Sequence, residues 1–228
     1  MSRTAKPASR RLGQWAALVG LGLLSACSNA PDAGKPVDFV KGIFTKSSNQ
    51  PRSAEQISAE AASALQNTEE RLILTALPSV EVTTVMQRIE ENGPYATYAT
   101  ANRRSLTLRN GMVTATRGLG SDLMSSDVTE ALRLVSARRA GQVTRTQRHL
   151  DGENLTVTTQ ARCTISPGSQ SQMAVGEIKA TVTTVTESCA SDERQFKNVY
   201  QVDGAGRVLG SKQWIGPDRG YLSIQQLR

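Results

Sequence analysis

Residues 154–165 read NLTVTTQARCTI, and this stretch decides the fold class because apolar and polar side chains alternate along most of it. One face of the predicted strand carries Leu155, Val157, Ala161, Cys163 and Ile165. Threonine, glutamine and arginine side chains take the other face. A period of two residues is typical of an antiparallel strand with one face on a core and the other in water.

Short turn sequences divide much of the remaining chain into similar runs. Asn110-Gly111, Asp151-Gly152 and Asp203-Gly204 each separate two such runs, and these pairs readily adopt the positive φ angles of a type I′ hairpin turn. We therefore predict a mainly β protein, either an antiparallel β-sandwich or a partly open β-barrel, of about ten strands with one or two short helices.

Two helices are expected to interrupt this pattern. Ser53 is the predicted N-cap of a helix that continues to about residue 66. A second helix is expected between Asp127 and Gly141, because Asp127 and Glu130 form a start that resembles a capping box and Gly141 provides a stop.

The first 26 residues have the layout of a bacterial lipoprotein signal peptide. Four basic residues precede an apolar run over residues 16–24, which is too short to span a membrane. Residues 24–27, LSAC, match the lipobox, in which the cysteine carries the acyl chains and becomes the first residue of the mature protein. We predict lipidation at Cys27, and Ser28 favours sorting to the outer membrane. A plain signal peptide with a chance cysteine is the alternative.

The charge balance supports the same division of the chain. The whole sequence has 27 basic and 20 acidic residues, a net charge of +7. Without residues 1–26, 23 basic residues face 20 acidic ones, a net charge of +3, so we expect no nucleic-acid partner. Residues 27–52 contain three prolines and are predicted to be a lipid-anchored linker. Residues 53–228 are predicted to form a single β-rich periplasmic domain.

Cys163 and Cys189 remain as a pair in the mature protein, and in an oxidising periplasm such a pair predicts a disulfide. A tight hairpin between residues 154–165 and 175–188 would place Cys189 on the order of 40 Å along the strand from the partner of Cys163. A disulfide needs Cα atoms within about 7 Å. Either these strands do not form a simple hairpin, or both thiols stay reduced.

Signals for catalysis are few. The one histidine, His149, lies at a predicted strand end and is expected at the surface, and the sequence has none of the common nucleophile or zinc motifs. We predict no catalytic residues, no metal and no cofactor.

Two groups of residues are candidates for a ligand or partner surface. Five arginines lie within 16 residues: Arg133, Arg138, Arg139, Arg145 and Arg148. Guanidinium groups bind phosphate and carboxylate in a bidentate way, so this patch could meet anionic sugar or lipid phosphate. Compensation of a helix dipole plus a solvated strand face is the alternative. Tyr200, Trp214 and Tyr221 could add an aromatic platform for sugar, or could pack in the core.

Two longer stretches point to a family. Residues 105–128 (SLTLRNGMVTATRGLGSDLMSSDV) and 196–227 (FKNVYQVDGAGRVLGSKQWIGPDRGYLSIQQL), with the lipobox, resemble the YjbF/GfcB family of lipoproteins associated with exopolysaccharide and group 4 capsule production. The resemblance implies a non-enzymatic lipoprotein of the outer membrane that faces the periplasm and assists polysaccharide production or export. Its implied partners are an outer-membrane barrel protein, other proteins of polysaccharide secretion and the polysaccharide itself. The alternatives are a lipid or lipoprotein carrier with a half-open barrel and, ranked last, a polysaccharide-modifying hydrolase.

Overall fold

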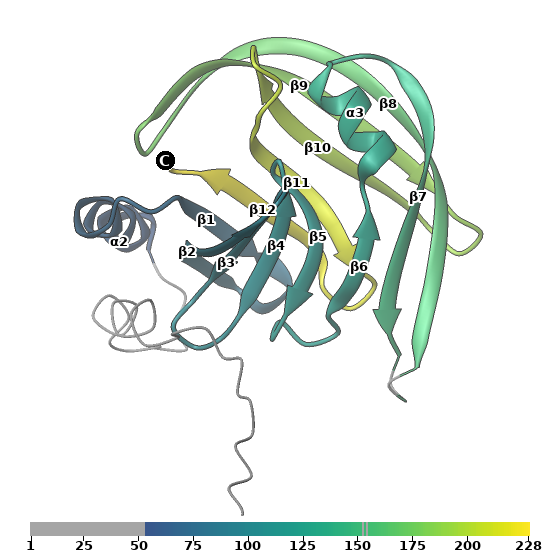
Figure 1. Cartoon of the computed structure of the whole chain (residues 1–228), viewed down its shortest axis with the longest axis horizontal. Coiled ribbons are helices and arrows are strands. Elements are labelled where there is room, and N and C mark those ends of the chain that lie inside the picture. The colour runs from purple at the N-terminus through teal and green to yellow at the C-terminus, as the bar shows by residue number, and fades with distance from the viewer. Residues whose placement is uncertain (1–52, 152, 154) are drawn as a thin grey trace, which may run out of the picture. The chain divides into compact units, whose positions relative to one another are not determined.

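The computed structural model describes residues 53–151, 153 and 155–228, and their strands form one curved sheet (Figure 1). The sheet has 12 strands in the order β5-β4-β3-β2-β1-β12-β11-β10-β9-β8-β7-β6, and every neighbouring pair is antiparallel. The prediction of a mainly β, antiparallel fold is confirmed, with 12 strands where about ten were expected. The strands are β1 (Leu72–Leu77), β2 (Val82–Asn92), β3 (Tyr95–Ala99), β4 (Ser105–Arg109), β5 (Met112–Arg117), β6 (Leu123–Asp127), β7 (Gly141–Leu150), β8 (Thr156–Val175), β9 (Ile178–Ala190), β10 (Gln195–Asp203), β11 (Val208–Gly216) and β12 (Gly220–Gln226).

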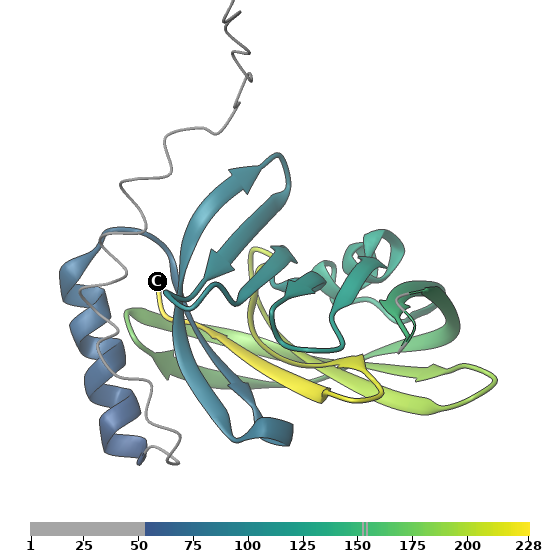
Figure 2. The same ribbon diagram turned by 90° about the horizontal axis from the view of Figure 1, so that it is seen from below.

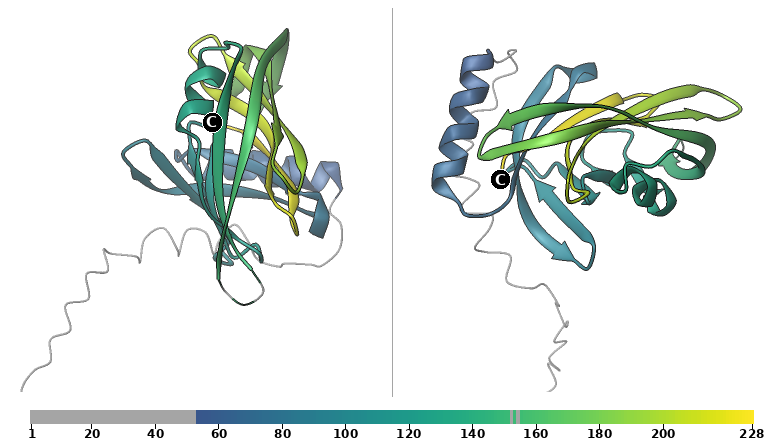
Figure 3. Two further views of the ribbon diagram at one scale, coloured as in Figure 1. Left: turned by 90° about the vertical axis from the view of Figure 1, so that its right-hand side faces the viewer. Right: turned by 90° about the horizontal axis from the view of Figure 1, so that it is seen from above.

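The sheet curls until its two ends come close together (Figure 3). β5 and β6 are the end strands, yet they follow each other in the chain and are joined by residues 118–122 alone. Gln213 of β11 reaches across the interior to β5: its Nε2 donates to the Gly111 carbonyl over 2.8 Å, and its Oε1 accepts from the Val113 amide over 2.9 Å. The result is a nearly closed, barrel-like sheet, which agrees with the predicted partly open barrel.

The core has two main clusters. The first lies between β1–β5 and the C-terminal strands and includes Ile73, Leu106 and Ile224. The second packs helix α3 (Thr129–Ser136) on β8, β9 and β10, with Val135 and Ile165 fully buried. Burial of apolar side chains on the concave side therefore holds the curled sheet together.

Helix α2 (Ala54–Asn67) lies beside the sheet (Figure 2) and begins where the sequence predicts. The Gln56 amide donates to the Ser53 hydroxyl, and the Ser53 amide donates to the Gln56 side chain over 2.9 Å, which is a complete capping box. Ala64 packs with Leu72 and Leu227, so the helix is fixed on β1 and on the C-terminal end of the chain.

Helix α3 is shorter than predicted. It ends at Ser136 rather than near Gly141, because Arg138 has a left-handed φ of 52°. The Arg138 amide then bonds to the Val135 carbonyl and the Arg139 amide to the Leu134 carbonyl, a Schellman end that usually contains glycine. The sequence offered no glycine there, so the stop was placed too late.

The long β8–β9 hairpin corrects the geometric objection to the disulfide. β8 continues through residues 166–175 with only an irregularity between Pro167 and Gln170, and the chain turns at Gly176. Cys163 therefore pairs directly with Cys189, their Cα atoms are 4.0 Å apart, and the two are joined by a disulfide. The objection assumed a turn soon after residue 165, and that assumption was wrong.

One predicted hairpin turn is confirmed and one is different. Asn110 and Gly111 have φ angles of 45° and 80°, as a type I′ turn requires. In the β10–β11 turn the positive φ belongs to Gly206 instead of Gly204, and the Asp203 carboxylate accepts from the backbone amide of Arg207 over 2.8 Å. Residue 152 of the third predicted turn is outside the described residues.

The predicted signal peptide (1–26), the linker (27–52), Cys27 and Ser28 all lie outside the described residues. Within the part of the chain that the structure describes, no helix combines the length and hydropathy needed to cross a bilayer.

Candidate functional site

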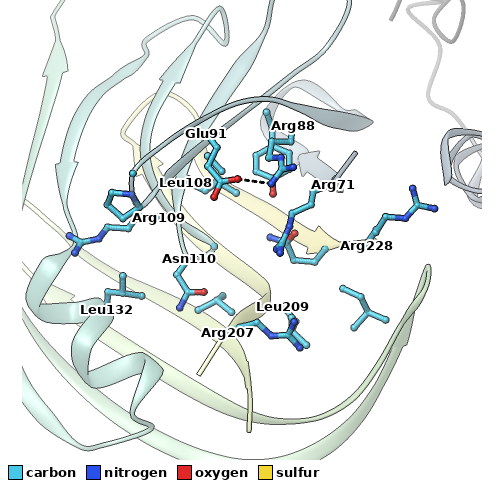
Figure 4. A pocket seen from close by; sticks show the side chains of 18 of the residues that line it. Arg71, Arg88, Glu91, Leu108, Arg109, Asn110, Leu132, Arg207, Leu209 and Arg228 are labelled. Carbon is cyan, nitrogen blue, oxygen red and sulfur yellow. Dashed lines mark hydrogen bonds and ion pairs between the residues drawn. The ribbon is translucent and has the colours of Figure 1, made fainter. Parts of the chain in front are cut away.

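A cavity of about 660 Å³ opens between the first strands of the sheet, the β10–β11 turn and the tip of the β8–β9 hairpin. Figure 4 shows arginines on several sides of it. The five arginines of its lining are Arg71, Arg88, Arg109, Arg207 and Arg228. Its apolar lining includes Leu108, Leu132, Ile178, Val208 and Leu209. The site therefore combines cationic groups with an apolar wall.

In two of these arginines every guanidinium nitrogen has a hydrogen-bond partner. Arg88 contacts Glu70 through Nε and Nη2 and Glu91 through Nη1, at 2.7–3.2 Å. Arg228 makes a bidentate ion pair with Glu177 and donates to the carbonyls of Leu65 and Thr68 at the end of α2. Both side chains fasten elements of the fold together.

The other three arginines keep unused donors. The side chain of Arg71 has no hydrogen bond or ion pair with any described residue. Arg109 donates from Nη1 to Thr129 over 2.9 Å, and Arg207 donates from Nε to the Asp203 carboxylate over 2.7 Å. Within the described residues, their remaining guanidinium nitrogens have no hydrogen-bond or ion-pair partner, although the Arg109 guanidinium lies 5.9 Å from the centre of the Tyr95 ring, and these nitrogens can bind an anion.

Tyr98 adds a neutral donor to the same lining. Its side chain is buried, and its hydroxyl is hydrogen-bonded to no described residue. Burial raises the pKa of Tyr98, an effect that the nearby guanidinium groups of Arg71 and Arg88 partly oppose. The phenol is therefore protonated at neutral pH and can donate a hydrogen bond.

The lining has fewer carboxylates than arginines. Only Glu69 and Glu91 contribute acidic side chains, and Glu91 is paired with Arg88. The other carboxylates that pair with lining arginines, Glu70, Glu177 and Asp203, do not belong to the lining. Among the lining arginines, Arg71 and Arg109 are the two that form no ion pair with a described carboxylate.

The structure separates the five arginines that the sequence grouped as a surface patch. Arg145 is 3% exposed and points into the core, whereas Arg148 lies on the outer face of the same strand. Arg133 is exposed beside Glu130, Arg139 is exposed, and Arg138 donates to the Asp203 carbonyl. Arg145 therefore cannot belong to a surface, and the period of two along β7 is the physical reason.

The three predicted platform aromatics are also separated. Tyr200 is fully buried, and Trp214 is 7% exposed and stacks on Phe196 with ring centroids 4.6 Å apart. Tyr221 is half-buried, its hydroxyl accepts from the Lys197 amide over 3.0 Å, and the Lys212 ammonium lies 5.1 Å from its ring. Tyr200 and Trp214 are core residues, which leaves Tyr221 alone as a partly accessible ring.

Arg145 and Tyr200 instead meet in a buried polar network around Glu187. The Glu187 Oε2 atom accepts from Arg145 over 2.9 Å, from Asn198 over 2.7 Å and from Tyr200 over 2.7 Å. Arg145 also donates to Ser126 over 2.8 Å. Burial, reinforced by the Glu187 carboxylate, raises the pKa of Tyr200 well above its ordinary value, so the phenol remains a donor. The network ties β6, β7, β9 and β10 together.

The disulfide lies next to this network. One carboxylate oxygen of Glu187 and the sulfurs of Cys163 and Cys189 lie within 4.8 Å of one another. Both sulfurs are bonded to each other, so neither offers the thiolate that a metal would need. His149 is buried against Trp214 rather than exposed at a strand end, and burial lowers its pKa.

Sequence reasoning missed the arginine-lined cavity because its residues come from distant parts of the chain. Arg71 precedes β1, Arg109 ends β4 and Arg207 lies in the β10–β11 turn. No local cluster or spacing joins them, and only the curling of the sheet brings them to one opening. The local arginine cluster of residues 133–148 was the stronger sequence signal and pointed elsewhere.

Comparisons with known proteins agree with this fold. The crystal structure of the hypothetical lipoprotein YmcC from Escherichia coli (K12) is similar, with a TM-score of 0.66 and 16% sequence identity. The likeness covers 81% of this chain and 97% of that one. A comparison with curated proteins gave no match. The family model described as "Group 4 capsule polysaccharide lipoprotein gfcB, YjbF" matches residues 40–227, and the chain therefore belongs to this family of capsule polysaccharide lipoproteins.

Proposed function

We propose that the protein is an outer-membrane lipoprotein that assists the production or export of an exopolysaccharide or capsule without catalysing a reaction. Its membership of a family of group 4 capsule polysaccharide lipoproteins carries this proposal. Cys27 would hold the lipid anchor, and the domain would face the periplasm. Its partners would be an outer-membrane barrel protein, other proteins of polysaccharide secretion and the polysaccharide itself.

The character of the cavity supports a binding role. Glycoside hydrolysis commonly needs two carboxyl groups on either side of the scissile bond. The lining has five arginines, and one of its two carboxylates, Glu91, is already bonded to Arg88. Such a lining suits the binding of an anion better than the protonation of a glycosidic oxygen. A lipid carrier would call for a deep apolar cavity, which the charged lining does not resemble.

A deletion strain tests the proposed function. Extracellular polysaccharide should fall when the gene is deleted and should return when the wild-type protein is supplied from a plasmid. The Cys27→Ala variant, which cannot be lipidated, should fail to restore it at equal protein level. Restoration by Cys27→Ala would contradict the need for the anchor, and an unchanged polymer level in the deletion strain would contradict the function itself.

A further inference from the structure

We propose that the arginine-lined cavity is a binding site for an acidic saccharide, with Arg71 and Tyr98 holding the anionic group. Arg109 and Arg207 would contact neighbouring sugar units of the same saccharide. The anionic group is a carboxylate carried by a sugar unit. This inference rests on the proposed function, because it names what the same protein would recognise in a polysaccharide.

The unused donors carry the inference. Arg71 has no hydrogen bond or ion pair with the described residues, and the Tyr98 hydroxyl, in the same lining, has no hydrogen bond with them. Arg71 is exposed and the Tyr98 hydroxyl is accessible to water, so both donors are open to a ligand that replaces this water. A carboxylate can accept from both donors, and guanidinium matches it with two parallel bonds.

Arg109 and Arg207 extend the site beyond one anion. Each keeps two guanidinium nitrogens without a hydrogen-bond or ion-pair partner among the described residues after its bond to Thr129 or Asp203. The three arginines come from β4, the β10–β11 turn and the residue before β1, so they border the cavity from different sides. A ligand with more than one charged or hydroxyl-bearing unit could contact several of them at once.

The size and the wall of the cavity suit sugar units. Its volume of about 660 Å³ lies within the usual range of small-molecule sites. Leu108, Ile178 and Leu209 provide an apolar wall, against which the C–H groups of a sugar ring can pack. A simple acyl chain would pack against this wall but would offer no acceptor to Arg71 and Tyr98.

The test is a titration of the full lipidated chain, purified in a non-ionic detergent, with three probes. Trigalacturonic acid is an acidic trisaccharide, maltotriose is a neutral one of the same length, and glycerol 3-phosphate represents a lipid headgroup. Calorimetry should show binding of the acidic trisaccharide that weakens as salt is added, and no binding of maltotriose. Equal binding of both trisaccharides would overturn the proposal. Binding of glycerol 3-phosphate alone would assign the site to a lipid headgroup and would also overturn it.

Three variants locate the binding. Arg71→Gln should weaken it by about tenfold or more, since it removes a charge-assisted bidentate contact. Tyr98→Phe should weaken it by a smaller factor, because it removes only the hydroxyl. Arg162→Gln is the matched control: Arg162 is exposed on the outer face of β8 and is not part of the lining, so its loss should leave binding unchanged. Circular dichroism checks that each variant folds. Equal binding by folded Arg71→Gln and wild type would refute the site.

The polymer assay separates the two proposals. A deletion strain that loses polymer but is fully restored by Arg71→Gln would keep the proposed function and refute the role of the cavity. A deletion strain with normal polymer would refute the function, whatever the titration shows. Loss of polymer that Arg162→Gln restores and Arg71→Gln does not would support both.

Discussion

Removing Arg145 should destabilise the protein more than the loss of any surface arginine. Arg145 is 3% exposed, and its guanidinium compensates the negative charge of the fully buried Glu187 carboxylate. The Arg145 Nη1 and Glu187 Oε2 atoms are 2.9 Å apart. The Arg145→Met variant leaves that carboxylate with its bonds to Asn198 and Tyr200 but without a counter-charge. Breaking a buried ion pair from one side typically costs about 3–5 kcal/mol, because an uncompensated charge stays buried.

Urea unfolding measures this cost. With a denaturant slope of about 2 kcal/mol/M, typical of a domain of moderate size, a loss of about 4 kcal/mol lowers the midpoint by roughly 2 M. The control is Arg162→Met, which removes the same side chain from the exposed face of β8. Its effect should stay within about 0.5 kcal/mol.

A double variant tests the reason for the loss. Glu187→Gln removes the charge and keeps an oxygen that can accept from Asn198 and Tyr200. Arg145→Met combined with Glu187→Gln should therefore be more stable than Arg145→Met alone. The reasoning is refuted if Arg145→Met costs less than about 1 kcal/mol, or if the second substitution lowers stability further.

Three other predictions concern the disulfide, a turn and pH. Replacing both Cys163 and Cys189 by alanine should lower the unfolding free energy by about 3–4 kcal/mol, since the bond closes a separation of 26 residues; an unchanged urea midpoint under oxidising conditions would contradict this. Gly111→Ala should lower the thermal midpoint by several degrees, because φ is +80° there and the new Cβ would lie 2.7 Å from Val208; an unchanged midpoint would show that the turn relaxes freely. Burial lowers the pKa of His149 below its ordinary 6.5, so stability should be lost as pH falls below about 6.5. His149→Phe should show a smaller loss of urea midpoint between pH 7.5 and 5.5, and an equal loss would argue against His149 as the group responsible.

Local patterns predicted the local structure well. The alternation in residues 154–165 identified β8, and Ser53 marked the start of α2. Those features depend on contacts between residues near each other in the chain. The expected core face holds for Ala161, Cys163 and Ile165 but is wrong for Leu155 and Val157, which are exposed near the start of the strand. The end of α3 was misplaced because Arg138, rather than a glycine, adopts the left-handed conformation.

Long-range features could not be predicted in the same way. The length of β8 depends on a ladder with β9 that continues beyond the irregularity after Pro167, where the residues are typical of a turn. The inward position of Arg145 depends on which face of β7 meets the core, and the cavity depends on the curling of all 12 strands. Family resemblance supplied the functional context that these residues did not reveal individually.

The most direct measurement is the extracellular polysaccharide of a deletion strain that carries wild-type protein, Arg71→Gln or Arg162→Gln at equal levels. The account predicts that polymer is lost on deletion, returns with wild type and Arg162→Gln, and stays reduced with Arg71→Gln. Normal polymer in the deletion strain would contradict the central claim that this lipoprotein serves polysaccharide production or export.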